Sequence, residues 1–458
     1  MQEKGADVKE QDRKQFLLKG SPGKLMVSLS LPAIVGMVVI GLYTFVDAIY
    51  AGQLISTDAM GAVSIAYPFT FINSGVSTLV GMGSASVLSR AIGAGEQSKV
   101  DKIMGNLIVA VIALSAVTTI VGVVFARPLL MLTGAEGEML DLAVTYMQVV
   151  FIGSLFVNFA QSSNMVMRGE GIMVKAMAIM GGGAILNMIL SPIFIVAVRD
   201  MGLGLQGAAA ATVVSQFLQA VAMLIWFVKF ERVARIHRIA LSTEILSEVL
   251  KIGVSAMLMQ VLTLVQQAVI YRAAAEWGGG EWQILFGAAL RIQAFAFIPL
   301  WGMSNGLQPA VGTNYGAGQF SRVRRILLTF CVGATVLCLV FWIPAMLAPD
   351  ALLSLFITDV DVVALGVCDF QVFFAPFVFY GLMIMAITFL QSIGEGGKAA
   401  VLTMCRPLVL FVPMVLIVPS VSGLGIHGVW LACVLTDLLV MVIAVAMVAG
   451  SFRKMRGA

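Results

Sequence analysis

Long apolar stretches, separated by short charged or Gly/Pro-containing connections, run through almost the whole chain. Each is long enough to cross the hydrocarbon core of a bilayer, which takes about 20 residues. Because a backbone in hydrocarbon must satisfy its own hydrogen bonds, we expect these stretches to be helices. The pattern therefore predicts an all-α integral membrane protein with twelve transmembrane helices. The stretches lie near residues 27–51, 60–88, 103–126, 142–167, 172–198, 205–230, 246–271, 284–311, 326–347, 365–392, 400–419 and 427–449.

The composition excludes the soluble classes of protein. Of the 458 residues, 60% are hydrophobic and 11% are charged, and the mean hydropathy is +1.00. A soluble globular protein carries about 25% charged residues, and no polar stretch here is long enough to form a large domain outside the membrane. The five cysteines form no C-x-x-C pair and the two histidines have no H-E-x-x-H spacing, so metal or redox chemistry is poorly supplied with ligands.

The basic residues set the expected orientation. With both termini placed in the cytoplasm, the tails and the inner connections hold all but four of the 28 Lys and Arg residues. The positive-inside rule favours this orientation. The net charge of +4 is dispersed over short connections, and we therefore expect no nucleic-acid partner. The first 24 residues are hydrophilic with mixed charge, which is typical of a tail and not of a cleavable signal peptide.

The two halves of the chain resemble each other in sequence. Three patterns recur in the same order and at a nearly constant offset. Six spans per half is an even number, so both halves enter the membrane in the same direction. Two six-helix bundles, related by a pseudo-two-fold axis along the membrane normal, are therefore expected. The paired patterns are Gly93-Ala-Gly95 with Gly316-Ala-Gly318, Gly169-Glu-Gly171 with Gly394-Glu-Gly396, and Gly202-Leu-Gly-Leu-Gln-Gly207 with Gly423-Leu-Gly-Ile-His-Gly428.

The repeat predicts two lobes with a cavity between them. This arrangement suits alternating access, in which one lobe rocks against the other. The expected divisions are a cytoplasmic N-terminal tail (1–24), an N-lobe with the first six helices (25–230), a cytoplasmic connector (231–243), a C-lobe with the last six helices (244–450) and a cytoplasmic C-terminal tail (451–458).

Asp47 is one of two carboxylates expected deep within a span. Ionisable residues inside a membrane are costly, and they commonly mark ion or substrate pathways. Tyr43 lies four residues earlier on the same helix face, where its phenol can hydrogen-bond the carboxyl or help to ligate a cation. The alternative is that Asp47 is a fixed partner in a buried polar network. Function is favoured, because a lone carboxylate in hydrocarbon must neutralise, pair or bind an ion.

A second polar group lies in the fifth and sixth spans. Asn187 and Ser191 are one turn apart, and Pro192 favours a kink that frees a carbonyl group. Thr212 follows in the sixth span, with Gln216 one turn further on. Oxygen donors of this kind suit a hard cation or a carboxyl hydrogen-bond network. Taken alone, Asn187 fits interhelical packing as well as it fits an ion ligand.

Asp437 is the other buried carboxylate, and the repeat places it opposite Gln216. Together with Gln161, Gln216, Gln260 and Gln267, it is a candidate for a substrate-binding or second polar site. Four further charged residues fall near predicted span ends, where snorkelling of the side chain explains them better than function does. These four are Asp369, Arg272, Arg291 and Arg406.

Several motifs in both halves form a specific pattern. They are Val46-Asp47-x-x-Tyr50-x-Gly52, Ser89-Arg90-x-x-Gly93-Ala-Gly95, Asn187-x-x-Leu190-Ser191-Pro192, Gly207-Ala-Ala-x-Ala-Thr212 and Gly306-Leu-Gln308-Pro309-x-x-Gly312-x-Asn314-Tyr315-Gly316-Ala-Gly318. In these motifs the chain resembles the multidrug and toxic compound extrusion (MATE) family of prokaryotic type. The resemblance implies a V-shaped, two-lobed antiporter with twelve helices, which exports organic cations in exchange for H⁺ or Na⁺. By motif position, it implies that Asp47 is the cation-coupling carboxylate, with Tyr43, Asn187 and Thr212 around it.

One departure from the family pattern concerns Ser191. Many prokaryotic relatives carry Asp at this position of the motif, so this chain has one negative charge fewer. Because ligand charge sets the affinity of a cation site, the departure favours H⁺ over Na⁺, and a Na⁺ site at Asp47 and Asn187 stays an alternative. The acidic residue that some relatives carry in the seventh span is also missing, and Gln260 and Gln267 lie in that stretch.

The leading hypothesis is a secondary active antiporter that exports cationic or amphipathic organic compounds across the cytoplasmic membrane, with no cofactor besides the coupling ion. The expected partners are small organic molecules and the bilayer, and the expected state is a monomer. The alternative is a flippase or exporter of lipid-linked or metabolite cargo, although few Lys or Arg residues lie at membrane depth to bind a pyrophosphate. A membrane-embedded enzyme is less favoured, since the sequence has no paired catalytic carboxylates, His cluster or Walker A motif.

Overall fold

A computed structural model of the chain describes residues 12, 14–50, 54, 57–131, 137–199, 201, 203–230, 233–236, 239–357 and 359–456. Within these ranges the secondary structure is helical, and the described residues contain no strand. Short turns connect most of the helices, which is what apolar spans with small polar connections require. The all-α prediction is confirmed.

The helices follow the order of the predicted spans. The first half contains α2 (Pro22–Tyr50), α3 (Thr57–Ala94), α4 (Gln97–Val124), α5 (Ala126–Met131), α6 (Gly137–Ile152), α7 (Ser154–Gly169), α8 (Met173–Arg199), α9 (Gly204–Ile225) and the π-helical turn η2 (Trp226–Phe230). The second half contains α10 (Thr243–Gly278), α11 (Gly280–Gly316), α12 (Phe320–Leu347), α13 (Pro349–Leu353), α14 (Val360–Phe374), α15 (Phe377–Ser392), α16 (Gly396–Met404), the π-helical turn η3 (Cys405–Phe411), α17 (Val412–Val421) and α18 (Ile426–Arg456).

The number of membrane spans agrees with the sequence pattern. Eleven helical stretches of the described chain are long and apolar enough to cross a membrane. The pair α6–α7, bent by 52° at Gly153, supplies the twelfth span when it is counted as one. Each of the twelve stretches overlaps one predicted span, so the prediction of twelve transmembrane helices is confirmed.

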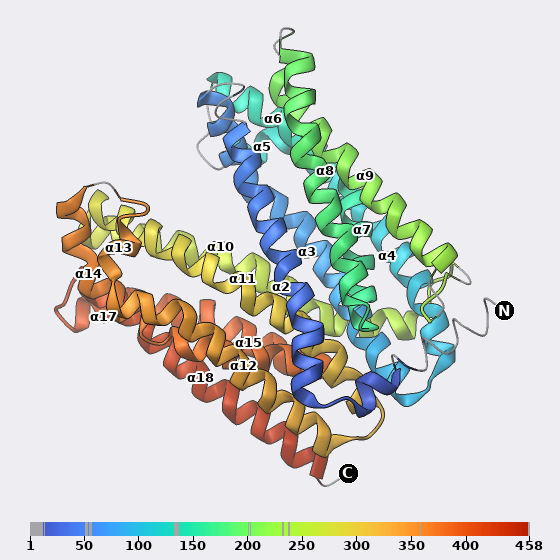
Figure 1. The fold of residues 1–458 in the computed structure, drawn as a ribbon. Coiled ribbons are helices and arrows are strands. Elements are labelled where there is room, and N and C mark those ends of the chain that lie inside the picture. The colour runs from blue at the N-terminus through green and yellow to red at the C-terminus, as the bar shows by residue number, and fades with distance from the viewer. Residues whose placement is uncertain are drawn as a thin grey trace.

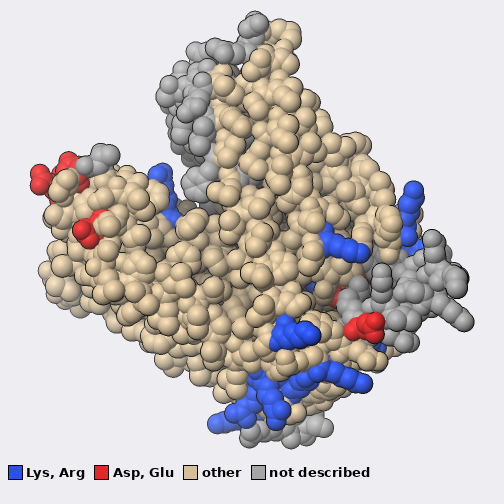
Figure 2. All heavy atoms as spheres, in the orientation of Figure 1, with Lys and Arg blue, Asp and Glu red and all other residues tan. Residues whose placement is uncertain are grey.

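The helices form two arms that diverge from a common base. Figure 1 shows α2–α9 in one arm and α10–α18 in the other, with the start of α2 and the end of α18 near the base. In the space-filling view a notch separates the two arms, and the Lys and Arg side chains visible on this face lie mostly around the base (Figure 2). The V-shaped architecture of two six-helix bundles is therefore present.

Equivalent features of the two halves recur at a constant spacing. The short helices α5 and α13 begin at Ala126 and Pro349. The fourth and tenth spans break just before α7 and α15, at Gly153 and Pro376, and this pair has the same separation along the chain as the first. A shared break at the same point of both spans shows that the repeat extends to local backbone geometry.

The constant spacing corrects one of the sequence matches. Gly171 and Gly394 both have a positive φ, of 83° and 84°, and each lies two residues after the last residue of α7 or α15. Glycine adopts this left-handed conformation without the steric cost that other residues meet, so it commonly ends helices. The residue equivalent to Gly171 is therefore Gly394 and not Gly396, and the Gly-Glu-Gly match is displaced along the chain.

The two arms meet where α3 and α11 come into backbone contact. A Cβ atom added to Gly93 would collide with the carbonyl oxygen of Thr313, and one added to Gly316 would collide with the carbonyl oxygen of Arg90. These two contacts are equivalent, because Gly93 corresponds to Gly316 in the repeat and Arg90 corresponds to Thr313. Small residues allow such close helix approach in membrane proteins. The two glycines therefore allow α3 and α11 to touch on both sides of the pseudo-two-fold axis.

The first helix of each half packs against the second helix of the other half. On α10, a Cβ atom added to Gly253 would collide with the carbonyl oxygen of Leu79 on α3. On α11, a Cβ atom added to Gly302 would lie 2.6 Å from the Cα atom of Ile34 on α2. The two lobes are therefore connected by the helix pairs α3–α10 and α2–α11. These pairs set the positions of the helices that carry the site residues described below.

The segment before α2 is also part of the base. Residues 14–19 are helical, and the Leu17 side chain is buried. The Leu17 carbonyl accepts a hydrogen bond of 2.9 Å from Asn314 Nδ2 on α11. Arg322, at the start of α12, donates to Asn314 Oδ1 at 2.8 Å and to the carbonyl of Gly20. The described part of this segment therefore covers the base and ties it to the second lobe.

The close approach at Gly253 gives a test of the packing. Gly253→Ala places a methyl group against the Leu79 backbone, and overpacking of this kind costs about 2 kcal/mol of stability. Gly182→Ala on α8 is the matched control, because a Cβ atom added there meets no atom within 4 Å and alanine favours helix. Thermal unfolding in detergent should show a lower midpoint for Gly253→Ala and an equal or higher midpoint for Gly182→Ala. Equal midpoints for both variants would contradict the interhelical contact.

Candidate functional site

Three of the predicted site residues lie together between α8 and α9. Asn187 Nδ2 donates to Thr212 Oγ1 at 3.2 Å, and Ser191 Oγ donates to Asn187 Oδ1 at 3.2 Å. All three side chains are buried. Asn187 and Ser191 share a face of α8 because they are one turn apart, and this face packs on α9. The three residues form a continuous hydrogen-bonded group, which we call the N-lobe cluster.

Asp47 and Tyr43 are the two predicted residues that belong to α2. The side chains of both lie outside the described residues. Their helix packs against α8, because a Cβ atom added to Gly36 of α2 would collide with the Met177 sulfur of α8. The helices that carry Asp47 and the N-lobe cluster are therefore neighbours, and the contact between the side chains stays a prediction.

Gln161 and Gln216 do not join the N-lobe cluster by a hydrogen bond among the described residues. Gln161 is half-buried on α7. The Oε1 atom of Gln216 is buried and has no hydrogen-bond partner within the described part of the chain. It lies beside the bend between α6 and α7, since a Cβ atom added to Gly153 would be 3.3 Å from it. Gln216 therefore faces the broken fourth span.

A polar network that the sequence reasoning missed connects α3, α4 and α7. Asn158 is its centre: Oδ1 accepts from Ser77 Oγ at 2.7 Å, and Nδ2 donates to Ser115 Oγ at 2.9 Å. Ser162 Oγ donates to the carbonyl of Ser77 at 3.0 Å. The signal in the sequence was Asn158 and Ser162 one turn apart, the same spacing as Asn187 and Ser191. Because these contacts are internal, this network fits interhelical packing.

The C-lobe contains a buried ion pair. Arg406 Nε donates to Asp437 Oδ1 at 2.8 Å. Arg406 Nη1 donates to Gln266 Oε1 at 2.8 Å, and Nη2 donates to the Tyr380 hydroxyl oxygen at 2.6 Å. The Tyr380 hydroxyl donates in turn to Asp437 Oδ2. We call these four residues the C-lobe cluster, and in it each charge is satisfied by several hydrogen bonds, as buried charges require.

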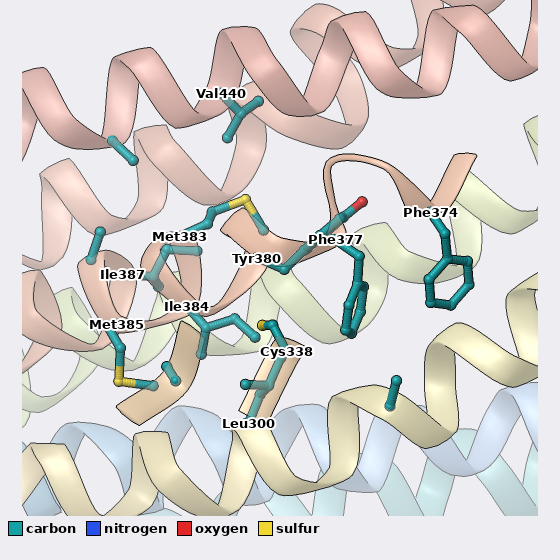
Figure 3. Packing of buried hydrophobic residues seen from close by; sticks show 14 of the residues in the cluster. Leu300, Cys338, Phe374, Phe377, Tyr380, Met383, Ile384, Met385, Ile387 and Val440 are labelled. Atoms are coloured by element: carbon teal, nitrogen blue, oxygen red, sulfur yellow. The ribbon is translucent and has the colours of Figure 1, made fainter. Parts of the chain in front are cut away.

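Packing fixes the geometry of this cluster. Figure 3 shows Tyr380 and Met383 on the side of α15 that faces Val440 of α18, while Ile384 lies on the side of Leu300. The ring of Phe297 meets the Tyr380 ring edge-on, with centroids 5.2 Å apart. The Tyr380 hydroxyl is thereby held next to α18, where Asp437 lies.

The structure corrects the snorkelling interpretation for two residues. Arg406 lies in the middle of the eleventh span, within η3, and its head group pairs with Asp437 instead of reaching an interface. Asp369 is buried on α14, and its carboxylate is 2.8 Å from His427 Nδ1 at the start of α18. Arg272 and Arg291 are exposed. The error arose because partners distant in sequence cannot be read from a single span.

A cavity of about 280 Å³ in the C-lobe is lined by residues of α10, α11, α15, α16 and η3. The predicted residues Gln260 and Gln267 line it, together with Gln266, Gln293 and Arg406. Asp437 is not among the lining residues, but it pairs with Arg406, which is. The predicted second polar site is thus divided: two of its glutamines face the cavity, and Asp437 holds the arginine that faces it.

Polar contacts hold the lobes together at the base. Arg90 on α3 forms an ion pair of 2.8 Å with Glu248 on α10. Ser86 Oγ donates to the carbonyl of Gln391 at 2.5 Å, and Gln308 Nε2 donates to the carbonyl of Met82 at 3.3 Å. Each of these contacts joins one half of the chain to the other. The base is therefore closed in this conformation, whereas the arms diverge above it.

Glu395, in the connection between α15 and α16, ties that connection to the end of α18. Lys398 Nζ donates to its carboxylate at 2.6 Å, and Ser451 Oγ donates to the same oxygen. Burial raises the pKa of Glu395, but the hydrogen bonds from Lys398 and Ser451 outweigh it and lower the pKa below its ordinary value. The carboxylate therefore stays charged at neutral pH and keeps this contact.

A double-mutant cycle tests the buried ion pair. Asp437→Asn leaves the Arg406 charge buried without its counter-charge, which costs about 3–5 kcal/mol, while adding Arg406→Gln removes both charges. The double variant should therefore unfold at a higher temperature than Asp437→Asn alone. Asp141→Asn is the matched control: its partner Arg127 is 2.9 Å away, but both side chains are more than half exposed, and we expect no measurable change. Additive effects of the two C-lobe substitutions would contradict the pairing.

The chain matches known proteins over most of its length. A family model described as MatE matches twice, over residues 32–193 and again over residues 256–417. The two matches begin at similar points of the two halves, in agreement with the repeat seen in the sequence and in the fold. Each match covers most of one lobe, so the similarity is not confined to a single motif.

Individual relatives show the same extent of similarity. The chain is 28% identical to the FAD transporter of Shewanella oneidensis, over 92% of this chain and 93% of the relative. It is 26% identical to the multidrug export protein MepA of Staphylococcus aureus, over 90% of this chain and 91% of the relative. Among solved structures, it is similar to the outward-facing conformation of a multidrug resistance MATE family transporter, with a TM-score of 0.89, 26% identity, and coverage of 96% and 98%.

Proposed function

Because the chain belongs to the MatE family, we propose that it is a secondary active antiporter, which exports small organic compounds from the cell in exchange for H⁺ or Na⁺. The observation that carries the proposal is the pseudo-symmetric pair of backbone contacts between α3 and α11, at Gly93 and Gly316. Two bundles that touch at one end and diverge at the other can exchange the open end by rocking. Alternating access needs this exchange and no separate energy-coupling domain.

The proposed orientation places both termini and the base in the cytoplasm. Lys and Arg residues gather around the base on the face shown in Figure 2, and inner connections of membrane proteins are rich in these residues. In this orientation the notch between the arms faces outward. The similar solved structure is also of an outward-facing conformation, so we take this conformation as the one that releases cargo. The working unit is proposed to be a monomer.

The N-lobe cluster is the proposed coupling region, with Asp47 as its ionisable group. The oxygen of the Asn187 amide already accepts a hydrogen bond from Ser191, and its nitrogen donates to Thr212. Amide and hydroxyl groups that satisfy one another in this way are less available to replace the water shell of Na⁺. This supports H⁺ as the coupling ion, with Asp47 as the group that takes up and releases the proton.

Export of an anionic or neutral metabolite is the second candidate function. One curated relative is an FAD transporter, and the C-lobe cavity supplies an observation that favours such cargo here. Among the described residues lining that cavity, Arg406 is the one ionisable side chain. A cationic substrate would meet a guanidinium group there and no carboxylate from these residues, so the cationic cargo that the sequence favoured is proposed only for the notch between the lobes.

Transport into proteoliposomes separates the proposals. The purified chain is reconstituted, and ethidium movement is followed while a pH gradient and a Na⁺ gradient are imposed one at a time. If the chain is an H⁺ antiporter, we expect the pH gradient alone to drive ethidium uptake. Uptake driven by Na⁺ alone would reassign the coupling ion, and no uptake under either gradient would contradict an antiporter of organic cations.

Asp47→Asn tests the coupling carboxyl. Asparagine keeps the size of the side chain but cannot carry or exchange a proton. We therefore expect the rate of pH-driven ethidium transport to fall by about tenfold or more. Asp47→Glu keeps the carboxyl and should retain partial activity. Asp361→Asn, at an exposed position on α14, is the control for loss of one acidic group. Transport by Asp47→Asn at the parental rate would show that coupling lies elsewhere, and Asp437 would be tested next.

Ser191→Asp tests the identity of the ion. A second carboxylate one turn from Asn187 raises the negative charge of the N-lobe cluster, and the apparent Na⁺ affinity should increase by about tenfold. Ser191→Asn, which has similar size and no charge, should leave the Na⁺ response as it is in the parent. The measurement is the Na⁺ dependence of ethidium transport at fixed pH. An unchanged Na⁺ response of Ser191→Asp would remove this residue from the coupling site.

A further inference from the structure

The C-lobe cavity has the shape and lining of a small-molecule site. It lies inside one lobe, and at about 280 Å³ it is close to the lower limit of ordinary ligand pockets, about 300 Å³. Phe297 and Trp301 of α11 and the methionines Met259 and Met383 line it. Aromatic faces and adaptable thioethers favour a flat, unsaturated ring system. This volume suits a ligand of about two fused rings.

The polar part of the lining is rich in amides. Gln260, Gln266 and Gln267 come from α10, and Gln293 comes from α11. The Gln266 oxygen accepts from Arg406 and the Gln293 nitrogen donates to Tyr380 at 3.4 Å, so each keeps its other amide atom for further hydrogen bonds. An amide presents an acceptor and donors side by side. The matching ligand edge is a ring lactam or imide, which also presents C=O and N–H side by side.

The charge of the lining favours neutral or anionic ligands. Arg406 is the one ionisable side chain among the described residues that line the cavity, and about a fifth of its side chain is exposed. Three of its five N–H groups bind Asp437, Gln266 and Tyr380, and the other two have no partner among the described residues. A guanidinium with two remaining N–H groups binds a carboxylate through its planar fork, whereas it repels a cation.

The position of Arg406 is set before any ligand arrives. It lies in the π-helical turn η3, directly before Pro407, and π-helical turns occur frequently at functional sites. Asp437 and Tyr380, which are not among the residues lining the cavity, accept hydrogen bonds from the guanidinium. A side chain fixed in this way loses little freedom on binding, so the site is preorganised.

We propose that the C-lobe cavity binds flat bicyclic heteroaromatic compounds with a lactam or imide edge, neutral or anionic, and that Arg406 contacts the anionic group. The glutamines pair with the ring edge, and Phe297 and Trp301 stack on the ring. This inference rests on the proposed function, because it assigns a substrate class to the antiporter in addition to the cations handled between the lobes. Asp437 and Tyr380 act as positioning residues.

The test uses three fluorescent probes. Pterin is neutral and has a lactam edge, pterin-6-carboxylate is an anionic derivative with the same rings, and ethidium is a cation. Binding to the purified full chain in detergent is measured by fluorescence anisotropy. Pterin-6-carboxylate should bind about tenfold more tightly than pterin, as expected for one charge-assisted interaction. Neither pterin should be displaced by ethidium. Displacement by ethidium, or equal affinity for the two pterins, would overturn the proposal.

Two sets of variants locate the binding. Gln260→Leu and Gln266→Leu remove amide groups from the lining and should each weaken pterin binding by about fivefold to tenfold, while Gln371→Leu is the matched control. Gln371 lies in the same lobe, outside the cavity, and donates to the carbonyl of Met346. Parental pterin affinity in both cavity variants would overturn the proposal.

The role of Arg406 is tested in a double variant, because a single substitution leaves Asp437 without its partner. Arg406→Gln with Asp437→Asn removes both charges and keeps two polar side chains in place. We expect this variant to retain the pterin affinity within about threefold and to lose the preference for pterin-6-carboxylate. A preference that survives in the double variant would overturn the assignment of the anionic contact to Arg406.

Failure of the cavity proposal can be told apart from failure of the antiporter proposal. If ethidium is transported under a pH gradient but neither pterin binds at concentrations up to about 1 mM, the cavity proposal fails and the antiporter proposal stands. If the pterins bind as described but no gradient drives any transport, the cavity proposal stands and the antiporter proposal fails.

Discussion

The close backbone contact between α3 and α11 is the constraint on which the rest of the structure depends. Gly93 and Gly316 allow each helix to reach a backbone carbonyl of the other, at Thr313 and Arg90. Between them, Ser89 faces Gly312, its own equivalent in the repeat, so the pseudo-two-fold axis passes through this point. The contact lies at one end of the molecule, where α10 also packs on α3 and α11 packs on α2. The lobes are therefore held together at this end, whereas the arms diverge at the other.

Around this shared contact the two lobes carry different chemistry on similar backbones. The N-lobe cluster consists of uncharged amide and hydroxyl groups beside the helix that carries Asp47. In the C-lobe, Asp437 is neutralised by Arg406 and the arginine faces a cavity. A buried carboxylate that already holds a guanidinium counter-charge is compensated without a coupling ion. This difference supports ion coupling in the N-lobe and a further substrate site in the C-lobe.

The sequence predicted what is local or periodic and missed what depends on long-range pairing. The twelve spans follow from apolar length, and the repeat follows from a nearly constant offset. Asn187 and Ser191 were found because they are one turn apart. The pairing of Arg406 with Asp437 joins two different spans and includes Tyr380 from a third helix, so no single window contains it. The broken fourth span at Gly153 was also missed, because hydropathy is unaffected by a bend.

The central claim is that the lobes rock about the contact between α3 and α11. Spin labels placed at equivalent exposed positions measure this directly. Met131 ends α5 and Ser354 follows α13, and these two short helices lie at the outer ends of the arms in Figure 1. Ser98 and Ser321 lie at the starts of α4 and α12, toward the base. The five cysteines are first replaced by serine or alanine, and the label distances are measured by double electron–electron resonance at high and low pH. The account predicts that the tip distance shortens as the base distance lengthens. Distances that stay constant at both ends, in protein that still transports, would contradict it.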